Sequence, residues 1–128
     1  MTQEFIPYQE ALDMKQLGFD EPCFGKYDGS GKHKGKLWYE MPNKGKDYIP
    51  VKDVLAPLYS QAFKWFRSKY DIACYVETKS LTTGGNTYDY TILVTKGDEW
   101  DDGKRWKTYE EAELACLRKL IELVKQQS

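Results

Sequence analysis

The sequence contains few of the residues from which catalytic and metal sites are commonly built. It has one histidine, His33, and three cysteines, Cys23, Cys74 and Cys116, which lie far apart without a C-x-x-C pair. Because the number of cysteines is odd and their spacing fits no metal-ligand pattern, the sequence favours reduced thiols in a cytoplasmic compartment. It argues against a disulfide framework or a zinc site.

Long apolar runs are also missing. The longest apolar stretch, Ile72–Val76, is far too short to span a membrane. The first residues do not form the basic and then apolar segment of a signal peptide. We therefore expect a cytoplasmic protein that does not bind a membrane. The net charge of −1 argues against a dedicated, strongly basic nucleic-acid-binding protein, although an average can hide a local patch.

Helical patterning is clearest in Thr108–Val124. Thr108 and Glu111 have the spacing of a capping box, in which the hydroxyl accepts a backbone N–H of the first turn. One broad face of this segment is apolar and consists of Tyr109, Ala112, Cys116, Leu117, Leu120, Ile121, Leu123 and Val124. Because a face this wide needs more than one neighbour, we expect a long helix that lies across a sheet and contacts another helix.

Two further helices are predicted. The first begins after Ile6-Pro7 and ends at Leu17-Gly18-Phe19, where glycine supplies a helix stop and Phe19 folds back on the last turn. The second is Leu55–Tyr70, in which apolar residues recur at i, i+3, i+4 and i+7, with Pro57 in its first turn.

Strands are predicted where alternating apolar stretches are bounded by glycine-rich turns. In chain order they are Cys23–Asp28, Lys36–Met41, Ile72–Lys79, Tyr88–Val94 and, as a fifth strand or a hairpin around Asp102-Gly103, Asp98–Lys107. Gly29–Gly35 is the turn of the first pair, Ser80–Asn86 is the loop of the second, and Pro42–Asp53 is an irregular connection.

These elements follow the order α-β-β-α-β-β-(β)-α. Short turns between the strands imply antiparallel pairing, and amphipathic helices cover one side of such a sheet. The sequence thus predicts a two-layer α+β fold in a single domain, residues 1–128. One antiparallel sheet of four to five strands would carry three helices mainly on one face.

Two groups of residues are candidates for a catalytic or metal site. A Cys23–His33 dyad is conceivable across the first hairpin, but nothing would hold the His33 ring in its glycine- and lysine-rich turn. The acidic run Asp98–Gly103 fails the EF-hand spacing because Trp100 occupies a position that needs an oxygen ligand. We therefore expect no enzymatic activity, no catalytic residue, no metal site and no cofactor. A metal-dependent hydrolase remains a third alternative that would require a bound ion.

An open sheet face is the strongest binding candidate. If Leu37, Tyr39 and Met41 point into the core, Lys36, Trp38 and Glu40 point outward. The same alternation exposes residues of the neighbouring strands, and the turn adds lysines at its tip, including Lys44 and Lys46. The predicted binding residues are Phe24, Lys26, Lys32, Lys34, Lys36, Trp38, Tyr75 and Lys79.

This face suggests two classes of ligand. An exposed aromatic patch is typical of a protein contact, so the first interpretation is a non-enzymatic binding domain whose partner is another protein or a second copy of the chain. The alternative is single-stranded nucleic acid, with bases stacked on the aromatic residues and phosphates bound by lysines. From Lys26 to Asp47 there are six lysines against three acids, but Asp98–Glu113 has seven acids against three bases and would repel the same ligand.

Three segments also resemble a known family. They are FIPYQEALDMKQLGFDEPC at Phe5–Cys23, APLYSQAFKWFRSKY at Ala56–Tyr70 and TYEEAELACLRKLIELVK at Thr108–Lys125. Together they are similar to a family of small uncharacterised proteins of gut-type bacteria and their phages or prophages. The resemblance covers the helices, roughly half of the chain. It implies a cytoplasmic, phage-derived accessory protein and carries no activity, cofactor or site residue.

Overall fold

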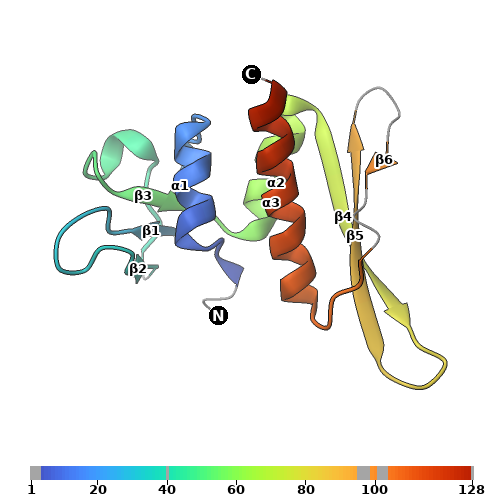
Figure 1. The fold of residues 1–128 in the computed structure, drawn as a ribbon. Helices are drawn as coiled ribbons and strands as arrows, with labels where there is room; N and C mark the ends of the chain where they lie inside the picture. Colours follow the sequence, from blue (N-terminus) through green and yellow to red (C-terminus); the bar gives the residue numbers. More distant parts are fainter. Residues whose placement is uncertain (1–3, 40, 95–98, 101–103, 128) are drawn as a thin grey trace. The chain divides into compact units, whose positions relative to one another are not determined.

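The computed structural model describes residues 4–39, 41–94, 99–100 and 104–127. Over these residues the chain forms an α+β fold with three α-helices and two antiparallel sheets (Figure 1). It divides into two compact units, Met1–Ala62 (unit 1) and Phe63–Ser128 (unit 2), and the boundary falls within helix α2, Tyr59–Tyr70. The predicted fold class is confirmed, whereas the prediction of a single domain stays a prediction.

Unit 1 contains one helix and three very short strands. Helix α1 is Tyr8–Gln16, and the strands are β1 (Gly25–Tyr27), β2 (Leu37–Trp38) and β3 (Val54–Ala56). β1 lies in the middle of the sheet, with Lys26 opposite Trp38 of β2 and Leu55 of β3. A 3-10 turn, Lys46–Tyr48, interrupts the connection between β2 and β3.

The glycine stop of α1 is confirmed. Gly18 has φ of 100° and its N–H donates to the carbonyl of Lys15 at 3.0 Å, while the N–H of Phe19 donates to the carbonyl of Met14 at 3.0 Å. This pair of bonds is the Schellman motif, which satisfies two carbonyls of the last turn. Phe19 is buried beside it, as the sequence pattern indicated.

Strand β3 was missed by the sequence prediction, which placed Val54–Ala56 partly in the second helix. α2 begins only at Tyr59, because Pro57 disfavours a helical conformation of Ala56 and β3 instead pairs along β1. All three residues of β3 are buried, so their run of apolar side chains reflects a covered strand.

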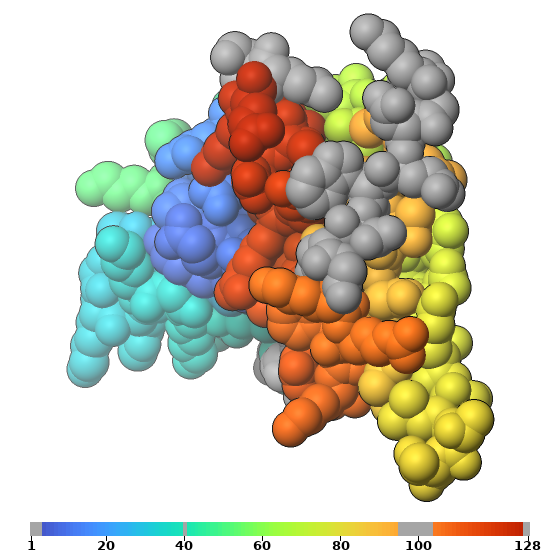
Figure 2. All heavy atoms as spheres, turned by 45° about the vertical axis from the view of Figure 1, so that its right-hand side comes forward, coloured from blue at the N-terminus to red at the C-terminus, as the bar shows by residue number. Residues whose placement is uncertain are grey.

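Unit 2 is built on a long hairpin. β4 (Ile72–Ser80) and β5 (Asn86–Val94) pair in register over nine residues, from Ile72 opposite Val94 to Ser80 opposite Asn86. β6 (Glu99–Trp100) pairs with the other side of β5. Figures 1 and 2 show the turn between β4 and β5, coloured yellow, extending past the start of the C-terminal helix.

That helix, α3 (Tyr109–Gln127), packs on β4 and β5. The Thr108 hydroxyl accepts the Glu111 N–H at 3.1 Å, which confirms the predicted cap. The buried face of α3 consists of Ala112, Cys116, Leu117, Leu120, Ile121 and Val124. Tyr90 and Ile92 of β5 are buried, but Tyr109, which was predicted on the apolar face of the helix, is 42% exposed, because it lies in the first turn.

The prediction of one sheet of four to five strands is not confirmed. The strands divide between two three-stranded sheets, β2-β1-β3 and β4-β5-β6. The central strands β1 and β5 each pair on both edges with strands of their own unit, and no strand of unit 1 pairs with a strand of unit 2 among the described residues. Asp98 and Asp101–Gly103 lie outside the described residues.

Candidate functional site

The predicted binding residues do not share one sheet. Phe24, Lys26 and Trp38 belong to unit 1, whereas Tyr75 and Lys79 lie on β4 in unit 2. Phe24, Trp38 and Tyr75 are exposed as predicted, at 55%, 45% and 43%. The single continuous platform was therefore wrong, because it depended on one sheet joining both sets of strands.

Two core assignments in unit 1 were also wrong. Tyr39 is 41% exposed and Met41 is 80% exposed. β2 ends at Trp38, so the alternation of inward and outward side chains does not continue to these positions. Unit 1 therefore exposes more apolar surface than the sequence pattern indicated.

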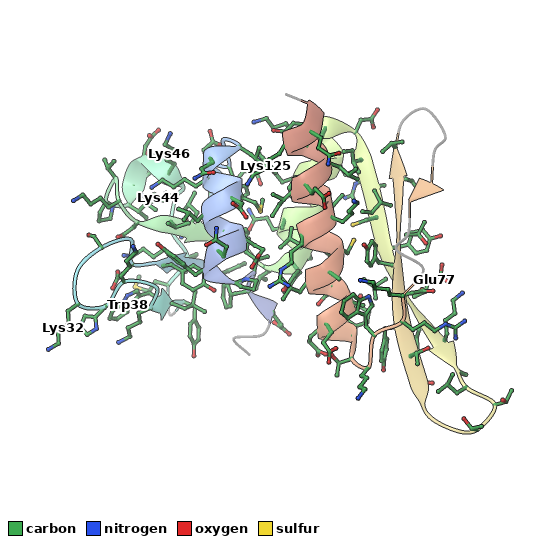
Figure 3. All side chains as sticks on the ribbon, in the orientation of Figure 1. Lys32, Trp38, Lys44, Lys46, Glu77 and Lys125 are labelled. Atoms are coloured by element: carbon green, nitrogen blue, oxygen red, sulfur yellow. The ribbon has the colours of Figure 1, made fainter. Side chains whose placement is uncertain are left out.

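The lysines of the first hairpin turn are exposed to solvent. Lys32, Lys34 and Lys36 are exposed in the turn, and Gly31 and Gly35 take the positive φ values of 81° and 86° that such a turn requires. Its base is closed by backbone bonds from Asp28 N–H to the Lys36 carbonyl at 3.0 Å and from Gly35 N–H to the Asp28 carbonyl at 2.7 Å. Figure 3 shows Lys32 on this turn, and Lys44 and Lys46 on the connection before β3.

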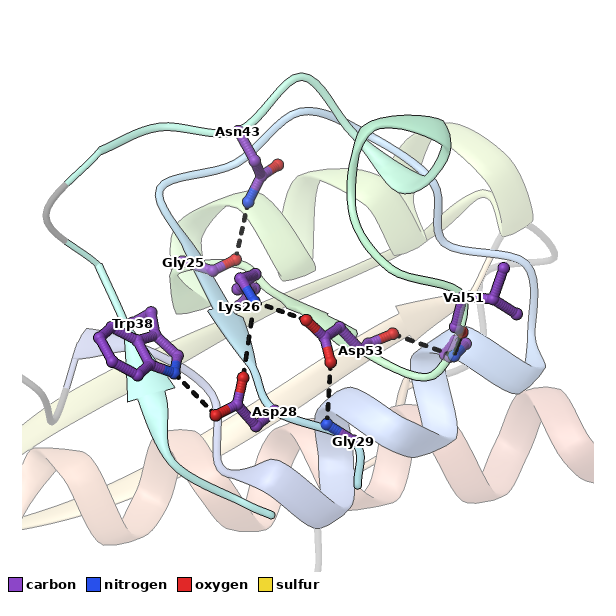
Figure 4. Close-up of polar contacts among 9 residues, drawn as sticks. Gly25, Lys26, Asp28, Gly29, Trp38, Asn43, Val51 and Asp53 are labelled. Carbon is purple, nitrogen blue, oxygen red and sulfur yellow. Dashed lines mark hydrogen bonds and ion pairs between the residues drawn. The ribbon is translucent and has the colours of Figure 1, made fainter. Parts of the chain in front are cut away.

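Lys26 belongs to an internal ion-pair network and is not a free surface cation. Its ammonium lies 2.5 Å from Asp53 Oδ2 and 3.5 Å from Asp28 Oδ1 (Figure 4). Asp28 Oδ2 accepts the Trp38 indole N–H at 3.0 Å, and Asp53 Oδ1 accepts the Gly29 N–H at 3.1 Å. These contacts connect β1, β2 and the residue before β3 through polar side chains.

The charges in this network shift each other's pKa. Burial alone would raise the pKa of Asp53, but the hydrogen bonds from Lys26 and Gly29 outweigh it and lower that pKa below its ordinary value. Burial alone would lower the pKa of Lys26, yet the hydrogen bond and charge of Asp53 raise it. Both groups are therefore held in their charged forms, and the pair contributes to structure.

A second set of contacts fixes the loop after β2. The Asn43 side-chain oxygen accepts the N–H groups of Cys23 and Gly45 at 3.1 and 3.2 Å, and its side-chain nitrogen donates to the Gly25 carbonyl at 3.0 Å. The Asn43 N–H donates to the Cys23 carbonyl at 2.8 Å. One side chain thus ties the loop to the start of β1, a role that the polar composition of Pro42–Asp53 gave no signal for.

Between this loop and the hairpin lies a groove of about 740 Å³. It is lined by Lys26, Asp28, Trp38, Met41, Pro42, Asn43, Lys44, Tyr48 and Ile49. Met41 and Tyr48, which is 70% exposed, form its most accessible apolar parts. No sequence signal indicated that the groove would include Met41, Asn43, Tyr48 and Ile49, because loop residues without periodicity give no indication of the surface they join.

Lysines lie over both aromatic rings of the groove. The Lys36 ammonium is 4.3 Å from the centre of the Trp38 ring, and the Lys44 ammonium is 5.8 Å from the centre of the Tyr48 ring. Such cation–π contacts hold positive charge beside exposed apolar surface. From Lys26 to Asp53 the sequence has seven lysines and four acids. Lys26 pairs with Asp28 and Asp53, so the other charged residues of this segment are six lysines and two acids.

A smaller cavity of about 370 Å³ adjoins the groove, since both include Ile49. Buried Phe19 and Leu55 line it, together with Pro50 and Val51, which is 90% exposed. The Lys15 ammonium donates to the carbonyls of Val51 and Asp53 at 2.7 and 3.0 Å and so holds this part of the chain against α1. The cavity can take an apolar side chain.

Cys23 and His33, the residues of the conceivable dyad, lie in different environments. Cys23 is buried, and its thiol donates to the Gly25 carbonyl at 3.2 Å and lies 3.7 Å from the side-chain oxygen of Asn43. Burial raises the pKa of this thiol, which disfavours the thiolate that a nucleophile needs. His33 is exposed in the hairpin turn. Cys116 is buried on α3, as expected for a core position.

Within the described ranges there is no cluster of three or more His, Cys, Asp or Glu side chains suited to a metal ion. Most of the acidic run Asp98–Gly103 falls outside those ranges, so the hypothesis of a metal site there stays untested. None of the helices that the structure describes is long and apolar enough to cross a membrane. Comparisons with protein-family models, curated proteins and solved structures find no match for this chain.

Proposed function

We propose that the protein is a non-enzymatic accessory domain that binds a protein partner through the exposed aromatic and methionine surface of unit 1. We call this the Trp38 surface. It comprises Phe24, Trp38, Tyr39, Met41, Tyr48 and Val51. The resemblance of the helical segments to small phage and prophage proteins is consistent with such an accessory role.

One observation carries the proposal. Among the described residues, ten large hydrophobic side chains are exposed, and six of them lie between Phe24 and Val51 in unit 1. Their concentration on a segment of short strands and loops is typical of a protein contact, since interface centres are enriched in Trp, Tyr, Phe and Met. The groove and the adjoining cavity give this surface relief into which a partner's side chains can fit.

The charge around the Trp38 surface defines the partner further. Lys32, Lys34 and Lys36 are exposed on the hairpin turn, Lys44 lines the groove, and Lys46 lines the adjoining cavity. A complementary partner carries acidic residues around an apolar centre, because opposite charges at an interface rim accelerate association and reject wrong partners.

Single-stranded nucleic acid is the alternative ligand of the same surface. The lysines suit phosphates, but the ammonium groups over the Trp38 and Tyr48 rings occupy positions where a base would stack. A base has to displace them before it can bind. The protein partner is therefore the better match, and the nucleic-acid alternative becomes an outcome of the experiment.

The test is site-specific photo-crosslinking in cells that produce the protein, with a photoreactive amino acid at position 41 or 48. We expect both positions to give an adduct with the same protein. We expect none from position 81, since Leu81 is also exposed, at 38%, but lies in unit 2. Tyr48→Ser should abolish the adduct at position 41, and Leu81→Ser should leave it unchanged.

Two results would contradict the proposal. The first is equal crosslinking from positions 48 and 81 to many proteins. The second is tight binding of short oligonucleotides by the purified protein that weakens steeply as salt rises, which would indicate phosphate contacts and the nucleic-acid alternative.

A further inference from the structure

The groove and the adjoining cavity of unit 1 lie over the same face of its sheet. Lys26 of β1 is directly opposite Trp38 of β2 and Leu55 of β3, so the three side chains point to one side. Lys26 and Trp38 line the groove, and Leu55 lines the cavity. Because Ile49 lines both, a single extended ligand can occupy the groove and the cavity together.

The polar side chains of the groove are largely bound to other parts of unit 1. Asp28 accepts the Trp38 indole N–H and lies 3.5 Å from the Lys26 ammonium (Figure 4). Asn43 is bound to the start of β1 through both its side-chain oxygen and its side-chain nitrogen. The rest of the lining is apolar or aromatic except for one lysine and consists of Met41, Pro42, Lys44, Tyr48 and Ile49. Recognition in the groove therefore depends on apolar surface and on lysines.

Two lysines place positive charge beside the aromatic rings of the groove. The Lys36 ammonium is 4.3 Å from the centre of the Trp38 ring, and the Lys44 ammonium is 5.8 Å from the centre of the Tyr48 ring. Neither lysine forms an ion pair with a carboxylate of the described residues, whereas Lys26 is paired with two acids. The groove thus has two positive charges available to a ligand.

The cavity has no such excess of charge. Its lining includes two lysines and two acids, namely Lys15, Lys46, Asp47 and Asp53. The Lys15 ammonium is already bound to two backbone carbonyls. Buried Phe19 and Leu55 supply apolar walls, and the volume is about 370 Å³. An apolar side chain therefore suits the cavity, and acidic groups suit the groove.

From this charge distribution we propose that unit 1 binds one short acidic peptide segment of its partner. An apolar side chain of the segment enters the cavity, and acidic side chains lie in the groove beside Lys36 and Lys44. The proposal rests on the function proposed for the Trp38 surface and adds the form and the charge order of the partner. A concave site of about 740 Å³ is typical of a small ligand or a peptide segment, whereas two folded domains bury about 800 Å² on each side.

Acidic side chains can bind without disturbing the groove. An ammonium that lies over an aromatic ring still has N–H groups directed away from the ring, and these can donate to a carboxylate. The loop wall is already fixed by Asn43, so little order has to be created when a peptide binds. Positive charge beside the apolar surface also excludes basic segments.

Selection from a displayed library of random short peptides tests the proposal with the full chain. We expect enrichment of peptides that carry one aromatic or branched apolar residue and a pair of acidic residues to one side of it. The variant Tyr48→Ser should not enrich them, because it removes an aromatic wall of the groove. No enrichment, or enrichment of peptides without acidic residues, would overturn the proposal.

That failure is distinguishable from a failure of the proposed function. Crosslinking of one partner protein from positions 41 and 48 in cells would still support a protein contact, in that case with a folded surface of the partner. An absence of such adducts would contradict the proposed function itself.

Charge reversal then tests the two lysines with an enriched peptide. K36E and K44E should each raise the peptide dissociation constant about tenfold in fluorescence anisotropy, because repulsion replaces attraction. The matched control is K52E, since Lys52 is exposed in the same unit but lines neither the groove nor the cavity. We expect K52E to bind like the unmodified protein, with circular dichroism confirming that all variants are folded.

Two changes to the peptide complete the charge test. Serine in place of its apolar residue should weaken binding by about tenfold or more, because the cavity is then left unfilled. Lysines in place of its acidic residues should restore binding to the double variant K36E/K44E. Equal effects of K52E and K44E, or no recovery in the double variant, would overturn the proposal.

The orientation of the peptide is tested by crosslinking with the purified chain. A photoreactive amino acid at position 51, which lines the cavity, should form its adduct at the apolar residue of the peptide. The same amino acid at position 41, which lines the groove, should form its adduct at the acidic residues. Mass spectrometry locates both adducts, and the reverse assignment would overturn the proposed charge order.

Discussion

The two units are held together by different kinds of interaction. Unit 1 has strands of two or three residues, and its loops are fixed by individual side chains, namely Lys15, Lys26, Asn43 and Asp53. Unit 2 has a nine-pair strand ladder covered by the apolar face of a 19-residue helix. Order in unit 1 therefore depends on a few specific polar contacts, whereas order in unit 2 is spread over a ladder and a core.

This difference also bears on the proposed binding site. The Trp38 surface is made of loops and strand ends positioned by polar contacts, as binding surfaces on scaffolds commonly are. The ladder of unit 2 is regular backbone, which repeats the same hydrogen-bonding pattern along its length. A single substitution can thus disturb the Trp38 surface from a distance, but the ladder responds mainly to changes in its own core.

The largest effect is expected for Gly29→Ala. A Cβ at this position would lie 1.4 Å from the Lys52 carbonyl oxygen, so the hairpin and the residues before β3 would have to separate. We expect a loss of about 4 kcal/mol in the free energy of unfolding, measured by urea titration. Gly85→Ala, which has no atom within 4 Å of the added Cβ but a φ of 83°, is the control that carries backbone strain without a steric clash. Similar effects of both variants would contradict the close approach.

Ile92→Ala tests the core of unit 2. Ile92 is fully buried on β5, and its truncation should lower the free energy of unfolding by about 3 kcal/mol because it leaves a cavity. The neighbouring Thr91→Ala, on the opposite face of β5, should have little effect. If Ile92→Ala were as mild as Thr91→Ala, the assignment of the buried face of the ladder would be wrong.

Asn43→Ala should show how far unit 1 depends on one polar side chain. The substitution leaves the N–H groups of Cys23 and Gly45 without their acceptor, so we expect a loss of about 2 kcal/mol in unfolding free energy. Binding to the Trp38 surface should weaken as well, since Asn43 positions the loop. Asn86→Ala, at an exposed position in unit 2, is the matched control. Equal stabilities of the two variants would remove the contrast between the units.

The smallest effect is expected from the Lys26–Asp53 pair and appears as a pH dependence. The pKa of Asp53 is lowered from its ordinary value of 3.8, so its contribution is fully present above that value. The contribution is lost as the pH falls through the lowered pKa, because the carboxyl group then takes up a proton. We expect this contribution to the free energy of unfolding to be about 1 kcal/mol. The stability of the unmodified protein should then fall more steeply at acid pH than that of Asp53→Asn. Parallel pH profiles of the two proteins would contradict it.

Local sequence signals predicted the elements of unit 2 better than those of unit 1. The capping pair Thr108 and Glu111 and the apolar periodicity of the last helix led to α3, and alternation led to β4 and β5. In unit 1 the glycine stop at Gly18 was found, but β3 was missed and β2 was extended to residues that are exposed. Strands of two or three residues are too short for periodicity to define their ends.

The candidate site was predicted only in part for the same reason. Trp38 and Phe24 were identified as exposed by alternation along a strand, and they are exposed. Met41, Asn43 and Tyr48 join Trp38 at the groove through the path of a loop, which no local pattern encodes. Lys26 was predicted as a ligand contact, yet its ion pair with Asp53 depends on residues 27 positions apart.

The sequence by itself determined the glycine stop of α1, the capped start of α3, the long hairpin and the α+β class, because these follow from interactions between residues close in the chain. Only the tertiary structure decided that the strands form two sheets, that Tyr75 and Trp38 belong to different units, and that the groove and the cavity adjoin at Ile49. Strand pairing and surface assembly depend on contacts between distant residues, and many pairings are compatible with the same local pattern.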